Sequence, residues 1–200
     1  MLSRLIALTY RSSRAREKIR TSIPTAKMRL TYTDDPPKMA TPADQAWVEK
    51  LVKQRGKLGL GPLYRSLLIS PNFARGFLQF FGVIRYQSSL PADVMELAMC
   101  RVGALNSAAF EWMHHAPLLL QAGVTEEGVE TVRTAKANHV PNGAEGGLSV
   151  RLWKIMRYAD AMTKDVAVSD EVFNAVKEEL KDEKQVVELS KISVQILIRH

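Results

Sequence analysis

The strong hydrophobic patterns of this chain repeat with the period of an α-helix. Apolar residues recur three and four positions apart, and no stretch of four or more residues alternates convincingly, as a half-buried strand would. The chain has 200 residues, of which 46% are hydrophobic and 24% are charged, which suits one globular domain with its own core. We therefore expect an all-α fold, a single-domain bundle of about eight helices.

Local start and stop signals place several of these helices. Thr41 followed by Pro42 predicts a capped helix start, and Gly56 predicts the end of that helix. Pro71 begins another helix, and we expect its phenylalanine stripe to lie in the core. Capping residues predict two later helix starts, at Thr125 and Ser169.

Residues 93–123 carry the only dense cluster of ionisable groups on apolar helix faces. They form two helix-length segments joined at Asn106 and Ser107. Asn106 can end the first helix in a left-handed conformation, and Ser107 can cap the second. The pattern predicts a helical hairpin with a very short connection, in which the two facing sides meet.

Three ionisable side chains lie on those facing sides. Glu111 and His115 are four residues apart, on one face of the second helix and within hydrogen-bond reach, and the first helix supplies Glu96. Two carboxylates and an imidazole that converge among apolar neighbours can perform general acid-base chemistry near neutral pH. The alternative is a surface pair without function, which is common at this spacing.

At these residues the chain resembles the carboxymuconolactone decarboxylase-like family, which includes the alkyl hydroperoxidase D-like proteins. The resemblance is carried by ELAMCRVGALN and by EWMHHAPLLLQAGV, with YADAMTKDVAVSDEVF as a further similar segment. The hydroperoxidase branch has Glu, eleven residues, Cys-x-x-Cys, three residues and then His. That spacing falls here on Glu96, Ala108, Glu111 and His115, so both redox cysteines are replaced. A disulfide cycle cannot run without the two thiols.

The resemblance implies a helical bundle of this type and suggests a first hypothesis for function. We expect a cofactor-free carboxy-lyase or isomerase that acts on a small carboxylated lactone or enolisable acid. His115 would be the proton donor, Glu111 would orient it, and Glu96 would be the second acid-base group. Arg101 or Arg85 would hold the substrate carboxylate, because guanidinium matches carboxylate geometry.

Further substrate contacts and alternative functions stay open at this point. Trp112 is a candidate substrate contact on the second helix of the hairpin. A peroxide-reducing protein is an alternative, in which Cys100, the single cysteine, would need a lowered pKa and an external thiol. Another alternative is an oligomeric binding or structural module that has lost catalysis.

The sequence offers no metal signature. It has no paired Cys and His spacings, and one cysteine excludes an internal disulfide framework. His114 and His115 are adjacent, so their side chains point about 100° apart on a helix and cannot easily share one ion with Glu111. We expect no metal and no cofactor.

The net charge of +7 lies in the first 30 residues, which hold eight basic residues and one acidic residue. Residues 31–200 are therefore neutral, and a basic nucleic-acid-binding face is not indicated. We divide the chain into a basic extension, 1–30, and a helical domain, 31–200. The extension is Arg- and Ser-rich with one apolar helical side, which is typical of a mitochondrial transit peptide. We expect a mitochondrial matrix location, with a cytoplasmic protein as the alternative.

Two further expectations concern assembly. No segment has the apolar length needed to span a membrane. The apolar excess of the helices, such as Leu118, Leu119 and Leu120, favours self-association, and the resemblance implies a trimer or hexamer. The C-terminal SKISVQILIRH departs from the family pattern, which bears on stability and assembly.

Overall fold

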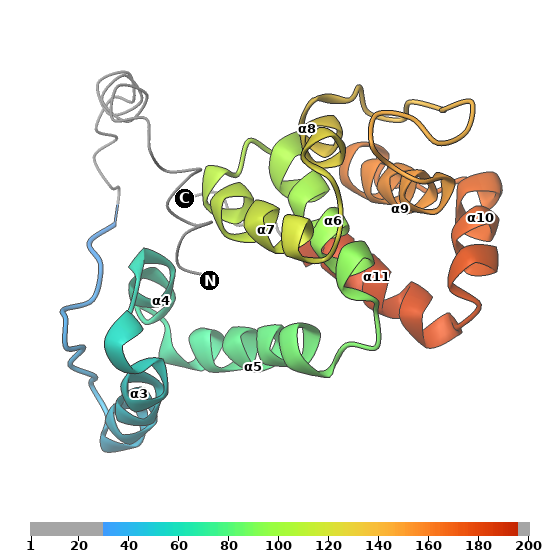
Figure 1. Cartoon of the computed structure of the whole chain (residues 1–200). Helices are drawn as coiled ribbons and strands as arrows, with labels where there is room; N and C mark the ends of the chain where they lie inside the picture. The colour runs from blue at the N-terminus through green and yellow to red at the C-terminus, as the bar shows by residue number, and fades with distance from the viewer. Residues whose placement is uncertain (1–29, 196–200) are drawn as a thin grey trace, which may run out of the picture. The chain divides into compact units, whose positions relative to one another are not determined.

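The computed structural model describes residues 30–195, and all the regular secondary structure in that range is helical (Figure 1). The pairing of Glu145 with Leu148 is an isolated bridge. The expectation of an all-α fold is therefore confirmed. The chain groups into two compact units, and the boundary between Leu78 and Gln79 falls inside one helix, α5. Each unit is described separately below.

The first unit contains three α-helices and one short 3₁₀ turn. Their bounds are α3 (Pro42–Arg55), η1 (Gly56–Leu58), α4 (Pro62–Leu67) and the first part of α5 (Pro71–Gln87). The Thr41 hydroxyl accepts a hydrogen bond from the Asp44 amide, which confirms the predicted cap, and Gly56 ends α3. A small core forms from Val48, Leu60, Leu68 and Ala74.

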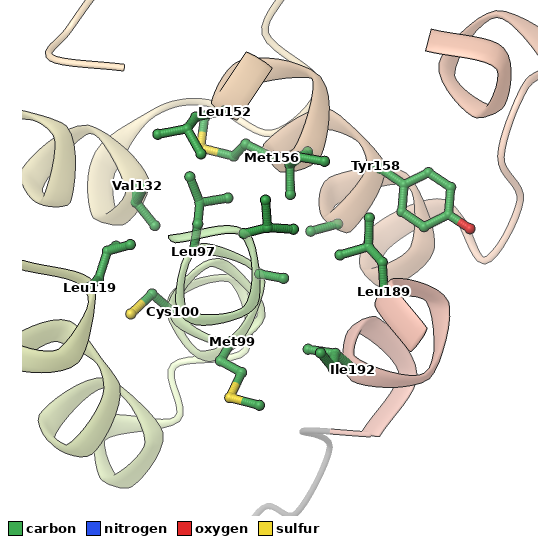
Figure 2. Packing of buried hydrophobic residues seen from close by; sticks show 14 of the residues in the cluster. Leu97, Met99, Cys100, Leu119, Val132, Leu152, Met156, Tyr158, Leu189 and Ile192 are labelled. Carbon is green, nitrogen blue, oxygen red and sulfur yellow. The ribbon is translucent and has the colours of Figure 1, made fainter. Parts of the chain in front are cut away.

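The second unit is built around α6 (Ala92–Leu105). Its other elements are α7 (Ala109–Gln121), α8 (Glu126–Thr134), α9 (Val150–Asp160), the π-helical turn η2 (Ala161–Asp165), α10 (Asp170–Leu180) and α11 (Glu183–Gln195). Nearly every residue of α6 from Val94 to Gly103 is buried, so neighbours must cover it on all sides. Figure 2 shows side chains of the surrounding helices packed about α6.

Gly103 lets α7 come close to α6. A Cβ atom at Gly103 would lie 3.3 Å from the Cβ of Glu111 and 3.6 Å from the Trp112 amide nitrogen. Contacts of 3.3 Å are tighter than packed side chains tolerate without a shift of the neighbour. The absence of a side chain here therefore sets how closely the helix that carries Glu111 and His115 approaches α6.

The connection between α6 and α7 differs in detail from the predicted one. Ser107, not Asn106, adopts the left-handed conformation, with φ of 55°, and Asn106 has φ of −98°. The N-cap of α7 is Ala108, which has no side-chain cap. The side-chain amide of Asn106 instead donates to the Val102 carbonyl, which gives this acceptor at the end of α6 a partner. The left-handed residue of the turn is then Ser107.

Of two other local predictions, the helix caps are confirmed and the phenylalanine stripe is partly wrong. The Thr125 and Ser169 caps are confirmed, because each hydroxyl accepts from the amide three residues later. The core placement of the phenylalanine stripe is wrong for Phe73 and Phe80, which are 63% and 42% exposed. The stripe follows helical spacing, but spacing alone does not supply the partner that would bury it.

Membrane-spanning helices are absent from residues 30–195, because none there combines the length and the apolar character that crossing a bilayer requires.

Candidate active site

Glu96 is the centre of a charged cluster inside the second unit. It lies on α6 and is 4% exposed. Arg85, near the end of α5, donates from Nη1 to Glu96 Oε1 at 2.5 Å. His115, on α7, places Nδ1 at 2.7 Å from Glu96 Oε2. Each carboxylate oxygen therefore has a cationic or proton-bearing partner, and the three groups come from three different helices.

The surroundings of Glu96 keep it ionised. Burial raises its pKa, but hydrogen bonds from His115 and Arg85, together with their charges, outweigh burial and hold the pKa below its ordinary value. An ionised carboxylate has no proton to donate, so the shared hydrogen belongs to Nδ1 of His115. Nε2 of the neutral ring is then the nitrogen without a proton, and it faces away from Glu96.

Glu111 lies on the Nε2 side of the same ring. Its Oε2 is 3.6 Å from His115 Nε2, which is within ion-pair range but longer than a hydrogen bond. The two side chains are 17% and 15% exposed, so this side of the imidazole is more open than the Glu96 side. A proton can therefore be exchanged at Nε2, with Glu111 as the neighbouring acid or base.

The geometry assigns the two carboxylates differently from the sequence analysis. Glu96 is buried, ionised and bonded to Nδ1, which is the arrangement that fixes the orientation and tautomer of His115. Glu111 faces the nitrogen that can transfer a proton. In the proposal below, Glu96 is therefore the orienting residue and Glu111 the second acid-base group.

Arg85 retains binding capacity beyond Glu96. Its side chain is 30% exposed, and within residues 30–195 its only hydrogen bond is the one from Nη1. The other guanidinium N–H groups are thus available to an anion beside the cluster. Arg85 is the one of the two predicted arginines that the structure brings to Glu96.

Arg101 binds groups other than Glu96. It is 1% exposed, and its guanidinium donates to both oxygens of Asp160 at 2.5 and 3.2 Å. It also donates to the carbonyls of Val132 and Ala135. Glu96 and Arg101 are five residues apart on one helix, so their side chains diverge. The structure gives Arg101 a structural role, and the sequence pattern contained no signal for its partner Asp160.

Trp112 and Cys100 both belong to the packing of the core. Trp112 is half-buried and packs against the core cluster of the second unit. Cys100 is fully buried (Figure 2), and burial, followed by the charge of Glu96, raises the pKa of its thiol. The thiol therefore stays protonated, which weighs against a peroxide-reducing cysteine.

His114 points away from the cluster, as the sequence analysis predicted for adjacent histidines. It is exposed, its ring lies 4.2 Å from that of Phe110, and its Nδ1 contacts the Phe110 carbonyl. Among the residues that the structure describes, no three His, Cys, Asp or Glu side chains are grouped so that they could hold a metal ion.

Comparison with known proteins gives one match. Residues 71–139 match the model of the carboxymuconolactone decarboxylase family. The predicted resemblance is confirmed. The matched segment contains Glu96, Glu111 and His115 together with Arg85, so the whole cluster lies within the residues that match the family model. No curated protein and no solved structure matches the chain.

Proposed function

We propose that the chain is a cofactor-free carboxy-lyase that acts on a small carboxylated lactone or enolisable acid. The observation that carries the proposal is the two-sided environment of His115. Its Nδ1 is held by an ionised, buried carboxylate, and its Nε2 faces a second carboxylate on the more open side. This arrangement favours proton transfer at one defined atom, Nε2.

The proposed reaction needs one proton and no redox step. The bond between the carboxylate carbon and the α-carbon breaks and carbon dioxide leaves. The electron pair passes to the α-carbon and is delocalised into the adjacent carbonyl as an enolate. His115, which in this step begins with a proton on both ring nitrogens, then gives the proton on Nε2 to the α-carbon and regains one from solvent through Glu111. One substrate and one proton thus yield carbon dioxide and one product.

Arg85 contributes to binding and to the enolate. Its free guanidinium N–H groups can contact the carboxylate and the neighbouring carbonyl oxygen in a bidentate manner. When the charge moves from the carboxylate to the enolate oxygen, the cation is already in place to stabilise it. Glu96 holds Arg85 on one side and His115 on the other, so it fixes the spacing between the two.

The test is a screen of β-oxo acids, carboxylated lactones and hydroperoxides on the purified protein, with carbon dioxide release and peroxide loss as readouts. We expect carbon dioxide release from at least one acid, reduced about 10²- to 10⁴-fold in His115→Gln. His114→Gln is the matched control, because His114 is exposed and does not contact the cluster. A folded His115→Gln protein with wild-type turnover would contradict the proposal.

The same screen separates the alternatives. Peroxide loss that disappears in Cys100→Ser and survives in Glu111→Gln would favour the peroxidase, against the burial of the thiol. A protein that turns over none of the compounds, and that binds none of them at His115, would favour an oligomeric binding or structural module. The expected trimer or hexamer stays a prediction, which light scattering of the purified protein checks.

A further inference from the structure

The turn between α5 and α6 is bound to α11 by hydrogen bonds. Oε2 of Glu188, on α11, accepts from the Ser88 hydroxyl at 3.0 Å, from the Ser89 amide at 2.8 Å and from the Ser89 hydroxyl at 2.9 Å. Gln185 donates from Nε2 to the Ser89 carbonyl at 2.9 Å. Positions 185 and 188 lie one helical turn apart, so the turn is bound to one face of α11.

The carboxylate of Glu188 is ionised, which fixes the direction of these hydrogen bonds. Burial raises its pKa, but the hydrogen bonds from Ser89 and Ser88, together with the charge of Lys184, outweigh burial and hold the pKa below its ordinary value. An ionised carboxylate can only accept, so both serine hydroxyls donate to it. The Ser88 oxygen also accepts from the Leu90 amide at 3.1 Å, just before α6 begins.

Packing of α11 against α6 places Glu188 relative to Glu96. Leu189, the residue after Glu188, is fully buried, and so is Ile192 one helical turn later. Both side chains belong to the core cluster around α6, the helix that carries Glu96 (Figure 2). Because a packed core is rigid, the turn that Glu188 binds has a fixed place relative to Glu96.

That turn directly follows the residue that binds Glu96. Arg85 lies in the last turn of α5, three residues before Ser88, and residues 88–91 are the whole connection to α6. Ile84 also packs in the core, but an apolar contact is not directional. The hydrogen bonds of the turn are directional, so they restrict how the end of α5 can rotate and shift. The bond of 2.5 Å from Arg85 to Glu96 requires such alignment.

We propose that Glu188 is a positioning residue of the candidate active site. By binding Ser88 and Ser89, it fixes the end of α5 and so aligns the Arg85 guanidinium with the Glu96 carboxylate. The inference rests on the proposed function for the use made of Arg85, which is to bind the substrate carboxylate. Glu188 itself touches no substrate, and its effect reaches the site through Arg85.

The carbon-13 resonance of the Glu96 carboxyl group, recorded at neutral pH and assigned with Glu96→Gln, tests the proposal. Arg85→Met removes the guanidinium bond and shows where the resonance lies without it. We expect Glu188→Ala to move the resonance at least about half of the way to that position. The double variant should match Arg85→Met alone, because Glu188 acts through Arg85. A folded Glu188→Ala protein with the wild-type resonance, or full addition of the two shifts, would overturn the proposal.

Further variants identify the contact that is responsible. Glu188→Gln keeps an oxygen that can take the place of Oε2, so it should restore most of the wild-type resonance if hydrogen bonding, rather than charge, aligns the turn. Ser88→Ala combined with Ser89→Ala removes both hydroxyl donors without altering α11, and should move the resonance in the same direction as Glu188→Ala. Lys191→Ala, exposed on the same helix, is the control and should leave the resonance unchanged.

The serine variant also decides the test if Glu188→Ala does not fold. A Glu96 resonance that stays at its wild-type position in the protein without both hydroxyl groups would overturn the proposal.

The outcome is separable from that of the proposed function, because the resonance is measured without substrate. A shifted resonance in Glu188→Ala, with no turnover of any acid by the wild type, would support the positioning role and remove the carboxy-lyase. An unshifted resonance, with turnover of an acid by the wild type, would overturn the positioning role and leave the carboxy-lyase standing.

Discussion

His115 and Glu96 are nineteen positions apart and belong to different helices, yet Nδ1 of the imidazole lies 2.7 Å from Oε2 of the carboxylate. The contact is possible because α7 approaches α6 closely at Gly103. It fixes one ring nitrogen as the proton-bearing atom and leaves the other to face Glu111. The proposed chemistry depends on this orientation.

Glu96→Gln should disable the site and weaken the fold. The amide cannot accept from both Arg85 and His115 as an ionised carboxylate does, so a charge-assisted network is lost. We expect a loss of about 1–3 kcal/mol in the free energy of unfolding, measured by urea denaturation. Glu130→Gln is the control, because that exposed ion pair should leave the denaturation midpoint unchanged. Equal midpoints for both variants would contradict the account.

The contribution of Glu96 to stability should depend on pH with a defined sign. Because its folded pKa is lowered, the folded state favours the ionised form. The contribution is fully present above the unfolded value of about 4.3 and is lost as pH falls through the lower, folded pKa. The difference in unfolding free energy between wild type and Glu96→Gln should therefore shrink below about pH 4. A difference in unfolding free energy that became larger at lower pH would contradict this prediction.

Breaking the Arg101–Asp160 pair should destabilise the protein without a direct effect on the site. Arg101→Met leaves Asp160 buried without its cation, and among residues 30–195 the Asn138 amide is its remaining hydrogen-bond partner. We expect a loss of about 3–5 kcal/mol in unfolding free energy. Replacing both residues by apolar ones should cost less than Arg101→Met alone, because no unpaired charge remains. Thermal denaturation of the three proteins makes the comparison.

Gly103→Ala tests the approach of the two helices. The added methyl group would press on the Cβ of Glu111, so α7 must shift and the contacts of His115 must lengthen. We expect altered His115 ring resonances, measured by NMR, and lower turnover. Gly82→Ala is the matched control, because its Cβ would meet no atom within 4 Å. His115 ring resonances that are the same in both variants would show that Gly103 does not position the site.

Much of the fold follows from local sequence, whereas the pairing of charges does not. Thr41 and Thr125 cap helices as predicted, because a cap depends on residues three positions apart. The proximity of Glu111 and His115 follows from helical spacing. The bond between Arg85 and Glu96 depends on how α5 and α6 are placed, and the bond between Arg101 and Asp160 joins positions 59 residues apart. No local pattern encodes such partners.

The targeting prediction concerns residues 1–27, which lie outside the described residues. A basic segment with one apolar helical side is drawn to anionic membrane surfaces and along a negative-inside potential. We expect a fluorescent protein fused behind residues 1–27 to accumulate in mitochondria, as seen by microscopy. The same fusion with four of its arginines changed to glutamine is the control. Cytosolic fluorescence of the unaltered fusion would remove the targeting prediction and leave the site unaffected.

The tautomer of His115 tests the central claim most directly. Nitrogen-15 NMR of histidine-labelled protein, assigned with His115→Gln, distinguishes a protonated Nδ1 from a protonated Nε2 in the neutral ring. The account predicts that Nδ1 carries the hydrogen, held by Glu96, and that Nε2 gains and loses the proton during titration. It also predicts that Glu96→Gln weakens this preference. A neutral ring with its hydrogen on Nε2 would contradict the account.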